Sequence, residues 1–72
     1  MDIGSAIRRA SIANGLTATQ VANLAGVSES TVVKWFTGNV PNGRALLLLE
    51  HRLPGLRVLL DAEYARFVSE AA

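Results

Sequence analysis

Residues 17–38 contain two short helix patterns joined by one glycine turn, and this arrangement constrains the fold more than any other feature of the chain. Thr17 followed by Gln20 is a capping box, in which each side chain satisfies a free backbone N–H of the other residue at a helix start. The first helix is expected to end at Gly26, because glycine adopts a left-handed conformation without steric penalty. Ser28 is a favourable N-cap for the second helix.

The second helix of this stretch is predicted over Glu29 to Thr37 and is closed by Gly38. Val32, Trp35 and Phe36 recur at the spacing of one helix face and therefore predict a single buried stripe. Two short helices joined by a short turn that contains glycine are the signature of a helix-turn-helix. The sequence therefore predicts a helix-turn-helix motif over residues 17–38.

The motif resembles the helix-turn-helix of the Cro and lambda-repressor (XRE) type of bacterial and phage regulators. The resemblance implies an all-α, compact five-helix domain in which helices 2 and 3 form the motif. It also implies that helix 3 lies in the DNA major groove while helix 1 crosses the DNA backbone. The residues that carry the resemblance are Leu16-Thr17, Ala22, Gly26-Val27-Ser28, Val32, Gly38 and Pro41.

Three further helices are predicted around the motif. The first covers Met1 to Asn14 and is expected to be capped by Asp2 or Ser5. The fourth starts near Pro41 or Asn42 and runs to about Leu53, because the residue before a proline is disfavoured in the α conformation. The last covers about residues 55–70 and is expected either to close the core or to form a dimer contact. The connections are short, so all 72 residues are expected to form a single helix-turn-helix domain.

Composition narrows the class of protein further. The chain has no cysteine, so disulfide bonds and cysteine-metal sites are excluded. Half of its residues are hydrophobic and 18% are charged, which is unusually apolar for a small domain and favours a self-association surface. No apolar run approaches the length of about 20 residues that a membrane span needs, and no secretory signal begins the chain. We therefore expect a cytoplasmic protein with no membrane contact.

The net charge of +1 is small for a nucleic-acid-binding protein. Residues 1–45 hold four basic and two acidic residues, giving +2, while residues 46–72 hold three arginines and four acidic residues, giving −1. This asymmetry predicts modest non-specific affinity for DNA. Dimerisation is then needed to reach a useful affinity for an operator.

Two features depart from the family pattern. Ser11 and Phe36 occupy positions that are commonly arginine and glutamate in the family, where the two form a salt bridge. Loss of both partners can be neutral or stabilising, whereas loss of one is costly, so we expect a repacked core. Ala18 occupies a position where many relatives carry a glutamine that contacts a phosphate. Anchoring there is expected to depend on the hydroxyl groups of Thr17 or Thr19 and on free backbone N–H groups at the helix start.

The exposed side of the second motif helix carries the expected base contacts. Lys34 can donate to guanine O6 and N7, Glu29 can accept from cytosine N4, and Val33 can contact a thymine methyl group. An alternative role for Glu29 is that of a favourable charge at a helix N-terminus. The predicted base-contact residues are Ser28, Glu29, Ser30, Val33 and Lys34.

Phosphate contacts are expected from helix 1, from the start of the motif and from the loop after it. Arg44 is the strongest candidate, because a guanidinium group can bind two phosphate oxygens at once. Arg8 and Arg9 either meet the backbone that helix 1 crosses or form a solvated basic turn. Thr17 is expected to act mainly as a cap, with a phosphate contact in addition. The predicted set is Thr17, Thr19, Thr37, Asn39, Arg44, Arg8 and Arg9.

The last two helices contain more apolar residues than one core requires. If Leu46, Leu49 and Leu53 point inward, Leu47 and Leu48 remain partly outside. The last helix has a broad apolar stripe, interrupted by Glu63, which predicts an isologous dimer contact. The alternative is a helix that only closes the core of its own chain. The predicted dimer residues are Leu47, Leu48, Leu56, Leu59, Leu60, Tyr64 and Phe67.

These patterns predict a sequence-specific regulator of phage or prophage type that binds a palindromic operator in double-stranded DNA and represses by occluding RNA polymerase. Activation through a polymerase contact is one alternative. Another is an antitoxin-like or adaptor protein whose apolar C-terminal half binds a protein partner. The sequence offers no carboxylate pair, activated nucleophile or phosphate loop, so neither an enzyme nor a cofactor is expected. His51 lacks neighbouring ligand residues and is expected to be a surface residue, not part of a metal site.

Overall fold

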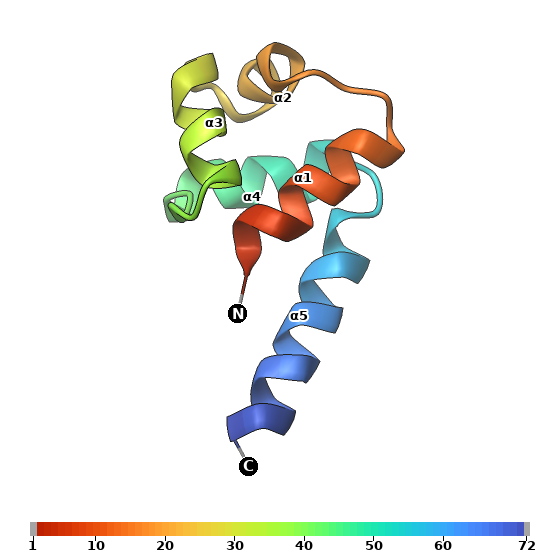
Figure 1. Ribbon diagram of the computed structural model, residues 1–72. Coiled ribbons are helices and arrows are strands. Elements are labelled where there is room, and N and C mark those ends of the chain that lie inside the picture. Colours follow the sequence, from red (N-terminus) through yellow and green to blue (C-terminus); the bar gives the residue numbers. More distant parts are fainter. Residues whose placement is uncertain (1, 72) are drawn as a thin grey trace.

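The computed structural model describes residues 2–71 and consists of five helices (Figure 1). No β-strand occurs within these residues, so the predicted all-α fold with five helices is confirmed. Asp2, one of the two predicted N-caps, caps the first helix by accepting a hydrogen bond of 2.9 Å from the Ser5 N–H, so the helix itself begins at Ile3. The helices are α1 (Ile3–Ala13), α2 (Ala18–Ala25), α3 (Glu29–Phe36), α4 (Gly43–Arg52) and α5 (Leu56–Ala71).

The predicted caps of the helix-turn-helix are present. Thr17 and Gln20 form both hydrogen bonds of the capping box at the start of α2. Gly26 ends α2 in the left-handed conformation with φ of +70°. Ser28 caps α3 by accepting the backbone N–H of Thr31. The capping box and the Ser28 cap therefore fix where α2 and α3 begin, and the left-handed Gly26 fixes where α2 ends.

The core is built largely from small and β-branched residues, which let short helices approach closely. Gly4 shows how close this approach is, since a Cβ atom there would overlap the carbonyl oxygen of Trp35. The N-terminal turn of α1 therefore lies directly against α3. The buried apolar residues are Ala6, Ile7, Ala10, Val21, Ala22, Ala25, Val32, Trp35, Ala45, Leu49, Leu53 and Leu56.

The two positions that depart from the family salt bridge are both accommodated without charge. Ser11 is buried, and its hydroxyl donates a hydrogen bond of 2.7 Å to the carbonyl oxygen of Ile7. Phe36 is partly buried and packs against the core. Because neither position holds a charge, no ionised group has to be desolvated there. This arrangement agrees with the predicted repacking of the core.

Helix α5 divides into an inner half that packs on the body and an outer half that does not. Leu56 is completely buried, and Leu59 and Leu60 pack against the core. From Tyr64 to Glu70 every residue is exposed, and α5 extends away from the other four helices (Figure 1). The assignment of Leu56 to a dimer contact is corrected accordingly, because a side chain with no exposed surface cannot reach a second molecule.

Two long-range hydrogen bonds hold α5 on the body. The Asn14 side-chain amide donates to the carbonyl oxygen of Pro54 at 2.8 Å, which joins the end of α1 to the turn before α5. The Asp2 N–H donates to a carboxylate oxygen of Glu63 at 3.3 Å, and Arg66 donates to the same oxygen at 2.8 Å. Glu63, which interrupts the apolar stripe in sequence, is therefore the buried point where α5 meets the start of α1.

Within residues 2–71, no helix combines the length and the apolar composition that a membrane span requires. The same residues contain no cluster of three or more histidine and acidic side chains that could hold a metal ion.

Candidate nucleic-acid interface

Helix α3 turns one side to the core and the opposite side to solvent. Val32 and Trp35 are buried on the first side. The five residues predicted to contact bases are all exposed, at the N-cap or on the opposite side of the helix. This separation follows from the helical period, which places residues three and four apart on a common face. The base contacts themselves remain predictions.

Three hydroxyl groups are linked at the N-terminus of α3. Ser28 Oγ lies 2.9 Å from Thr31 Oγ1 and 3.1 Å from Ser30 Oγ, and it also accepts the Thr31 N–H. Each hydroxyl can donate one hydrogen and accept others, so the direction of the chain of hydrogen bonds can reverse. Ser30, at the exposed end, can therefore present either a donor or an acceptor to DNA.

The start of α2 leaves a hydroxyl hydrogen available. Thr17 Oγ1 accepts the Gln20 N–H at 3.2 Å, and the Thr17 N–H donates to the Gln20 side chain at 2.8 Å. The Thr17 hydroxyl hydrogen takes no part in these two bonds and can donate to a phosphate oxygen. Thr19 is exposed in the same helical turn. Both residues are therefore accessible at the start of α2, and their phosphate contacts stay predictions.

The end of α3 is less favourable for phosphate than the sequence suggested. The Thr37 hydroxyl donates to the carbonyl oxygens of Val33 and Lys34 at 3.3 and 3.1 Å. A phosphate diester can only accept hydrogen bonds, so Thr37 must first release these carbonyl groups before it can donate to DNA. Asn39 is exposed two residues later, and it is the better candidate for a phosphate contact in this loop.

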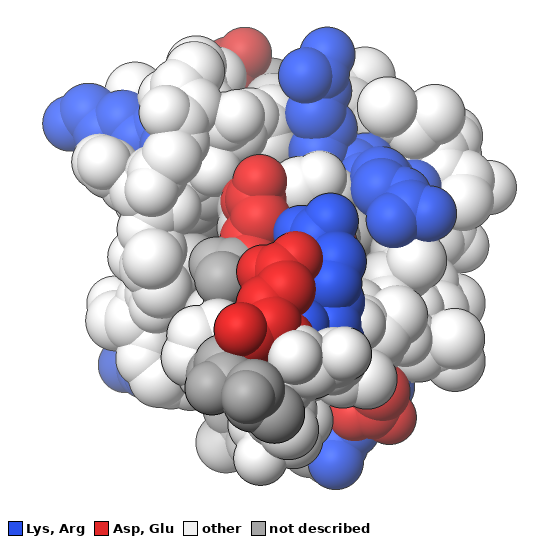
Figure 2. Space-filling view, turned by 60° about the horizontal axis from the view of Figure 1, so that its bottom comes forward, with Lys and Arg blue, Asp and Glu red and all other residues white. Residues whose placement is uncertain are grey.

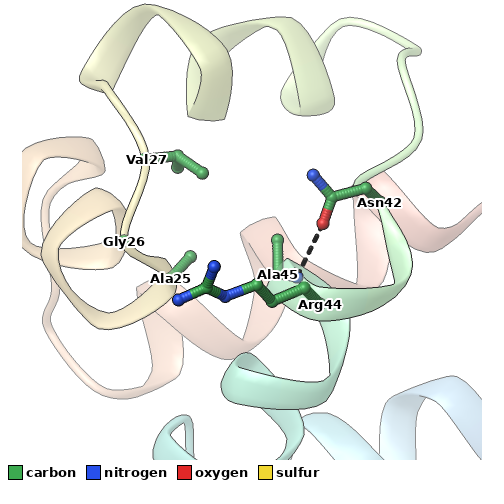
Figure 3. A pocket seen from close by; sticks show the side chains of 6 residues that line it. All are labelled: Ala25, Gly26, Val27, Asn42, Arg44 and Ala45. Atoms are coloured by element: carbon green, nitrogen blue, oxygen red, sulfur yellow. Dashed lines mark hydrogen bonds between the residues drawn. The ribbon is translucent and has the colours of Figure 1, made fainter.

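Arg44 lies in an open cavity of about 200 Å³ between the turn of the motif and the start of α4 (Figure 3). Its guanidinium group extends toward Ala25 and Gly26, at the C-terminal end of α2, where a positive charge is favourable. Asn42 caps α4 beside it by accepting the Ala45 N–H at 2.8 Å. Arg44 is exposed and has no acidic partner among the described residues, and its phosphate contact stays a prediction.

The basic residues fall into two groups. All four ion pairs within residues 2–71 involve Arg57 or Arg66 of α5. Figure 2 looks onto the free end of α5 and shows acidic and basic side chains next to one another there. The other group has no acidic partner within 4.0 Å among the described residues, so no nearby acid offsets its attraction to a polyanion. This group consists of Arg8, Arg9, Lys34, Arg44 and Arg52.

Comparison with known families gives a match to the helix-turn-helix family over residues 7–56. The matched region runs from within α1 to the first residue of α5 and contains the whole motif. The chain belongs to the Cro and lambda-repressor (XRE) type of helix-turn-helix regulators. Members of this family bind DNA and regulate transcription, so the chain is a DNA-binding transcriptional regulator. No curated protein and no solved structure matches the chain significantly.

Some surface residues of this helix-turn-helix regulator were not singled out by sequence reasoning. Val40, in the loop after α3, is 66% exposed, and Val68 is 45% exposed on the outer half of α5. Val68 could have been found, because it follows Tyr64 by four residues and shares its helix face. Arg52 was also missed as a link between helices, since it donates to the carbonyl oxygen of Leu24 at 3.1 Å.

Proposed function

We propose that the chain is a repressor of phage or prophage type that binds a palindromic operator in double-stranded DNA as a homodimer. The observation that supports this most directly is the exposed side of α3, which carries Glu29, Val33 and Lys34; within residues 2–71, neither Glu29 nor Lys34 forms an ion pair. In this family α3 enters the major groove, and these three side chains offer an acceptor, an apolar group and a donor to base edges.

The proposed phosphate contacts surround the same helix. Thr17 and Thr19 lie at the start of α2, where free N–H groups and the helix dipole favour an anion. Asn39 and Arg44 lie after α3, and Arg8 and Arg9 are exposed on α1. With so few cations one domain binds DNA weakly, so two domains on one duplex are needed to multiply the contacts.

The proposed dimer contact combines α4 with the outer half of α5 and with the partly buried Leu59 and Leu60 of its inner half. Tyr64 and Phe67 are 60% and 49% exposed, and Leu47 of α4 is 56% exposed. Leucine and aromatic residues exposed in this way mark an association surface more often than an isolated apolar residue does. Arg57 joins Glu50 of α4 to Asp61 of α5 and forms a charged edge. The proposed apolar contacts are Leu47, Leu48, Leu59, Leu60, Tyr64 and Phe67.

The proposed mechanism is occlusion. A dimer bound over a promoter in the cytoplasm covers the DNA that RNA polymerase needs, so transcription falls while the operator is occupied. The same docked domain can instead touch polymerase and activate transcription, in which case the operator lies beside the promoter. Transcription from the selected operator, placed over or upstream of a promoter, distinguishes the two modes.

The first test is selection of random DNA fragments by the purified chain, followed by titration of the best fragment at several salt concentrations. An inverted repeat whose half-sites are about 34 Å apart is expected, together with a steep decrease of affinity with salt. Sedimentation at tens of micromolar should show the dimer. A monomer at that concentration would contradict the proposed interface, and no enriched sequence would contradict specific DNA binding.

A second candidate function is that of an antitoxin-like or adaptor protein that binds a protein partner. The exposed apolar side chains of the outer half of α5 favour it, because such a surface can also receive a different chain. If DNA binding is secondary, alanine at Lys34 and Arg44 should leave the biological activity unchanged. Loss of activity in these two variants supports the DNA-binding regulator.

A further inference from the structure

Arg52, in the last turn of α4, forms a long-range hydrogen bond to α2. Its Nη1 donates to the carbonyl oxygen of Leu24 at 3.1 Å, across 28 positions of sequence. Leu24 lies in the last turn of α2, where the carbonyl groups of a helix have no partner in the helix itself. The helix dipole alone favours a cation in the last turn of α4, but it does not explain why this side chain is directed to another helix.

The packing between α2 and α4 leaves room for movement. The two helices lie against each other and bury Ala22 and Ala25 from α2 and Ala45 from α4. Alanine side chains are short, so they allow close approach but interlock little. The open cavity of about 200 Å³ is lined by Ala25 and Ala45, so this packing is not filled at the start of α4. Because close packing is what resists relative motion, a directional hydrogen bond at the other end of α4 has a role that the alanines cannot fill.

Arg52 also stands where α4 joins α5. Leu53 and Leu56, which follow it closely, are both buried. The carbonyl oxygen of Pro54, between them, accepts a hydrogen bond of 2.8 Å from the Asn14 side chain. The start of α5 is therefore fixed to the body immediately after the residue that binds α2. Through Arg52, α2 is held to the same junction from which α5 extends.

We propose that Arg52 is a positioning residue that sets the distance between the two α3 helices of the dimer, and with it the half-site spacing that the dimer accepts. This inference rests on the proposed function, in which α5 forms part of the dimer contact. Gly26 and Ser28 fix the short turn between α2 and α3, so α3 follows α2. A shift of α2 relative to α5 therefore moves α3 relative to the α3 of the second copy.

The spacing of half-sites is a sensitive measure of this distance. One base pair moves a half-site by about 3.4 Å along the duplex and turns it by about 35° around the axis. A dimer whose α3 helices are held firmly accepts one spacing and rejects its neighbours. A dimer in which α2 can shift distinguishes the spacings less well.

The test compares the unmodified chain with Arg52→Ala on the selected operator and on two versions whose half-site spacing is one base pair shorter or longer. The affinity of Arg52→Ala for the selected operator should fall about fivefold, the effect of one hydrogen bond. Its affinity for the two altered operators should hardly change, so the preference for the selected spacing falls by the same factor. Fluorescence anisotropy at several salt concentrations should give the salt slope of the unmodified chain, because Arg52 acts on α2 and not on a phosphate.

Arg66→Ala is the matched control, because it removes an arginine that forms ion pairs within its own helix, α5. It should keep the spacing preference of the unmodified chain. Thermal melting checks that Arg52→Ala is folded at the assay temperature, which is expected because Arg52 is exposed and alanine favours a helix.

Two outcomes would overturn the role of Arg52 while leaving operator binding intact. A salt slope smaller by about one ion in Arg52→Ala would identify Arg52 as a direct phosphate contact. An unchanged spacing preference in Arg52→Ala would show that the bond to Leu24 does not position α3. Selection that yields no inverted repeat would instead overturn the proposed dimer on DNA and this inference together.

Discussion

Helices α1–α4 and the outer half of α5 use similar residues in opposite ways. In α1–α4 the apolar residues form a core of closely packed short helices, and three of the basic residues that remain unpaired lie on α1 and α3. In the outer half of α5 the apolar residues are exposed, while Arg66 is paired with acidic residues. The difference predicts that packing of the first region supplies most of the stability, while the second region leaves apolar side chains uncovered.

The largest effect is expected at the closest contact of the body. Gly4→Ala places a Cβ atom on the carbonyl oxygen of Trp35, and backbone atoms cannot be repacked as side chains can. The free energy of unfolding should fall by more than about 3 kcal/mol. Gly43→Ala is the control, because nothing lies within 4 Å of a Cβ atom there and glycine is a poor helix former. Urea denaturation followed by circular dichroism measures the free energy of unfolding of both variants. A Gly4→Ala variant as stable as the unmodified chain would show that α1 does not approach α3 so closely.

Two apolar residues of α5 should separate the inner half from the outer half. Leu56→Ala removes a completely buried side chain and should cost about 3 kcal/mol of unfolding free energy. Phe67→Ala should change the stability of the isolated chain by no more than about 0.5 kcal/mol, since Phe67 is half exposed. It should nevertheless weaken the proposed dimer at least about tenfold in sedimentation. Equal stability losses in the two variants would mean that the outer half is packed.

Cations of the two regions should contribute differently to DNA affinity. Lys34→Ala removes an unpaired charge from α3 and should lower operator affinity about tenfold, with a salt dependence smaller by about one ion. Arg66→Ala removes a charge that already interacts with Glu63 and Glu70, so its effect on affinity should be much smaller. Fluorescence anisotropy at several salt concentrations measures both slopes. Similar slopes would show that ion pairing on α5 does not decide which cations meet DNA.

The smallest expected effect concerns the hydrogen bonds that hold α5. Glu63→Gln keeps the volume of a buried side chain but weakens the bonds from the Asp2 N–H and from Arg66, at a cost of about 1 kcal/mol. Asp61→Asn is the matched change at an exposed acid that pairs with Arg57, and it should be neutral. Chemical denaturation distinguishes the two. A neutral Glu63→Gln would mean that α5 is held by its leucines alone.

The sequence was sufficient for the features that depend on neighbouring residues. The capping box of Thr17 and Gln20, the N-cap at Ser28 and the left-handed Gly26 each need only residues within one helical turn. The exposed side of α3 also followed from periodicity, because Val32 and Trp35 mark the buried side. The family followed from the same local pattern and is shown by the match over residues 7–56.

The features that the sequence did not predict depend on where distant elements meet. Leu56 and Tyr64 share an apolar stripe, and only the point at which α5 leaves the body makes the first a core residue and the second exposed. The Asp2–Glu63 hydrogen bond joins residues 61 positions apart. The direction of the Arg44 side chain depends likewise on a cavity shared by two segments.

The exposed segment from Tyr64 to Glu70 also bears on how such regulators can diversify. Because these side chains lie outside the core, they can be exchanged without the compensating changes that a packed position demands. If the segment forms the dimer contact, the proteins encoded by duplicated genes could keep the same α3, and therefore the same operator. Changes in the segment would then stop the two proteins from forming mixed dimers. The same freedom is open to protein engineers, who could build sets of mutually exclusive regulators on a single unaltered scaffold.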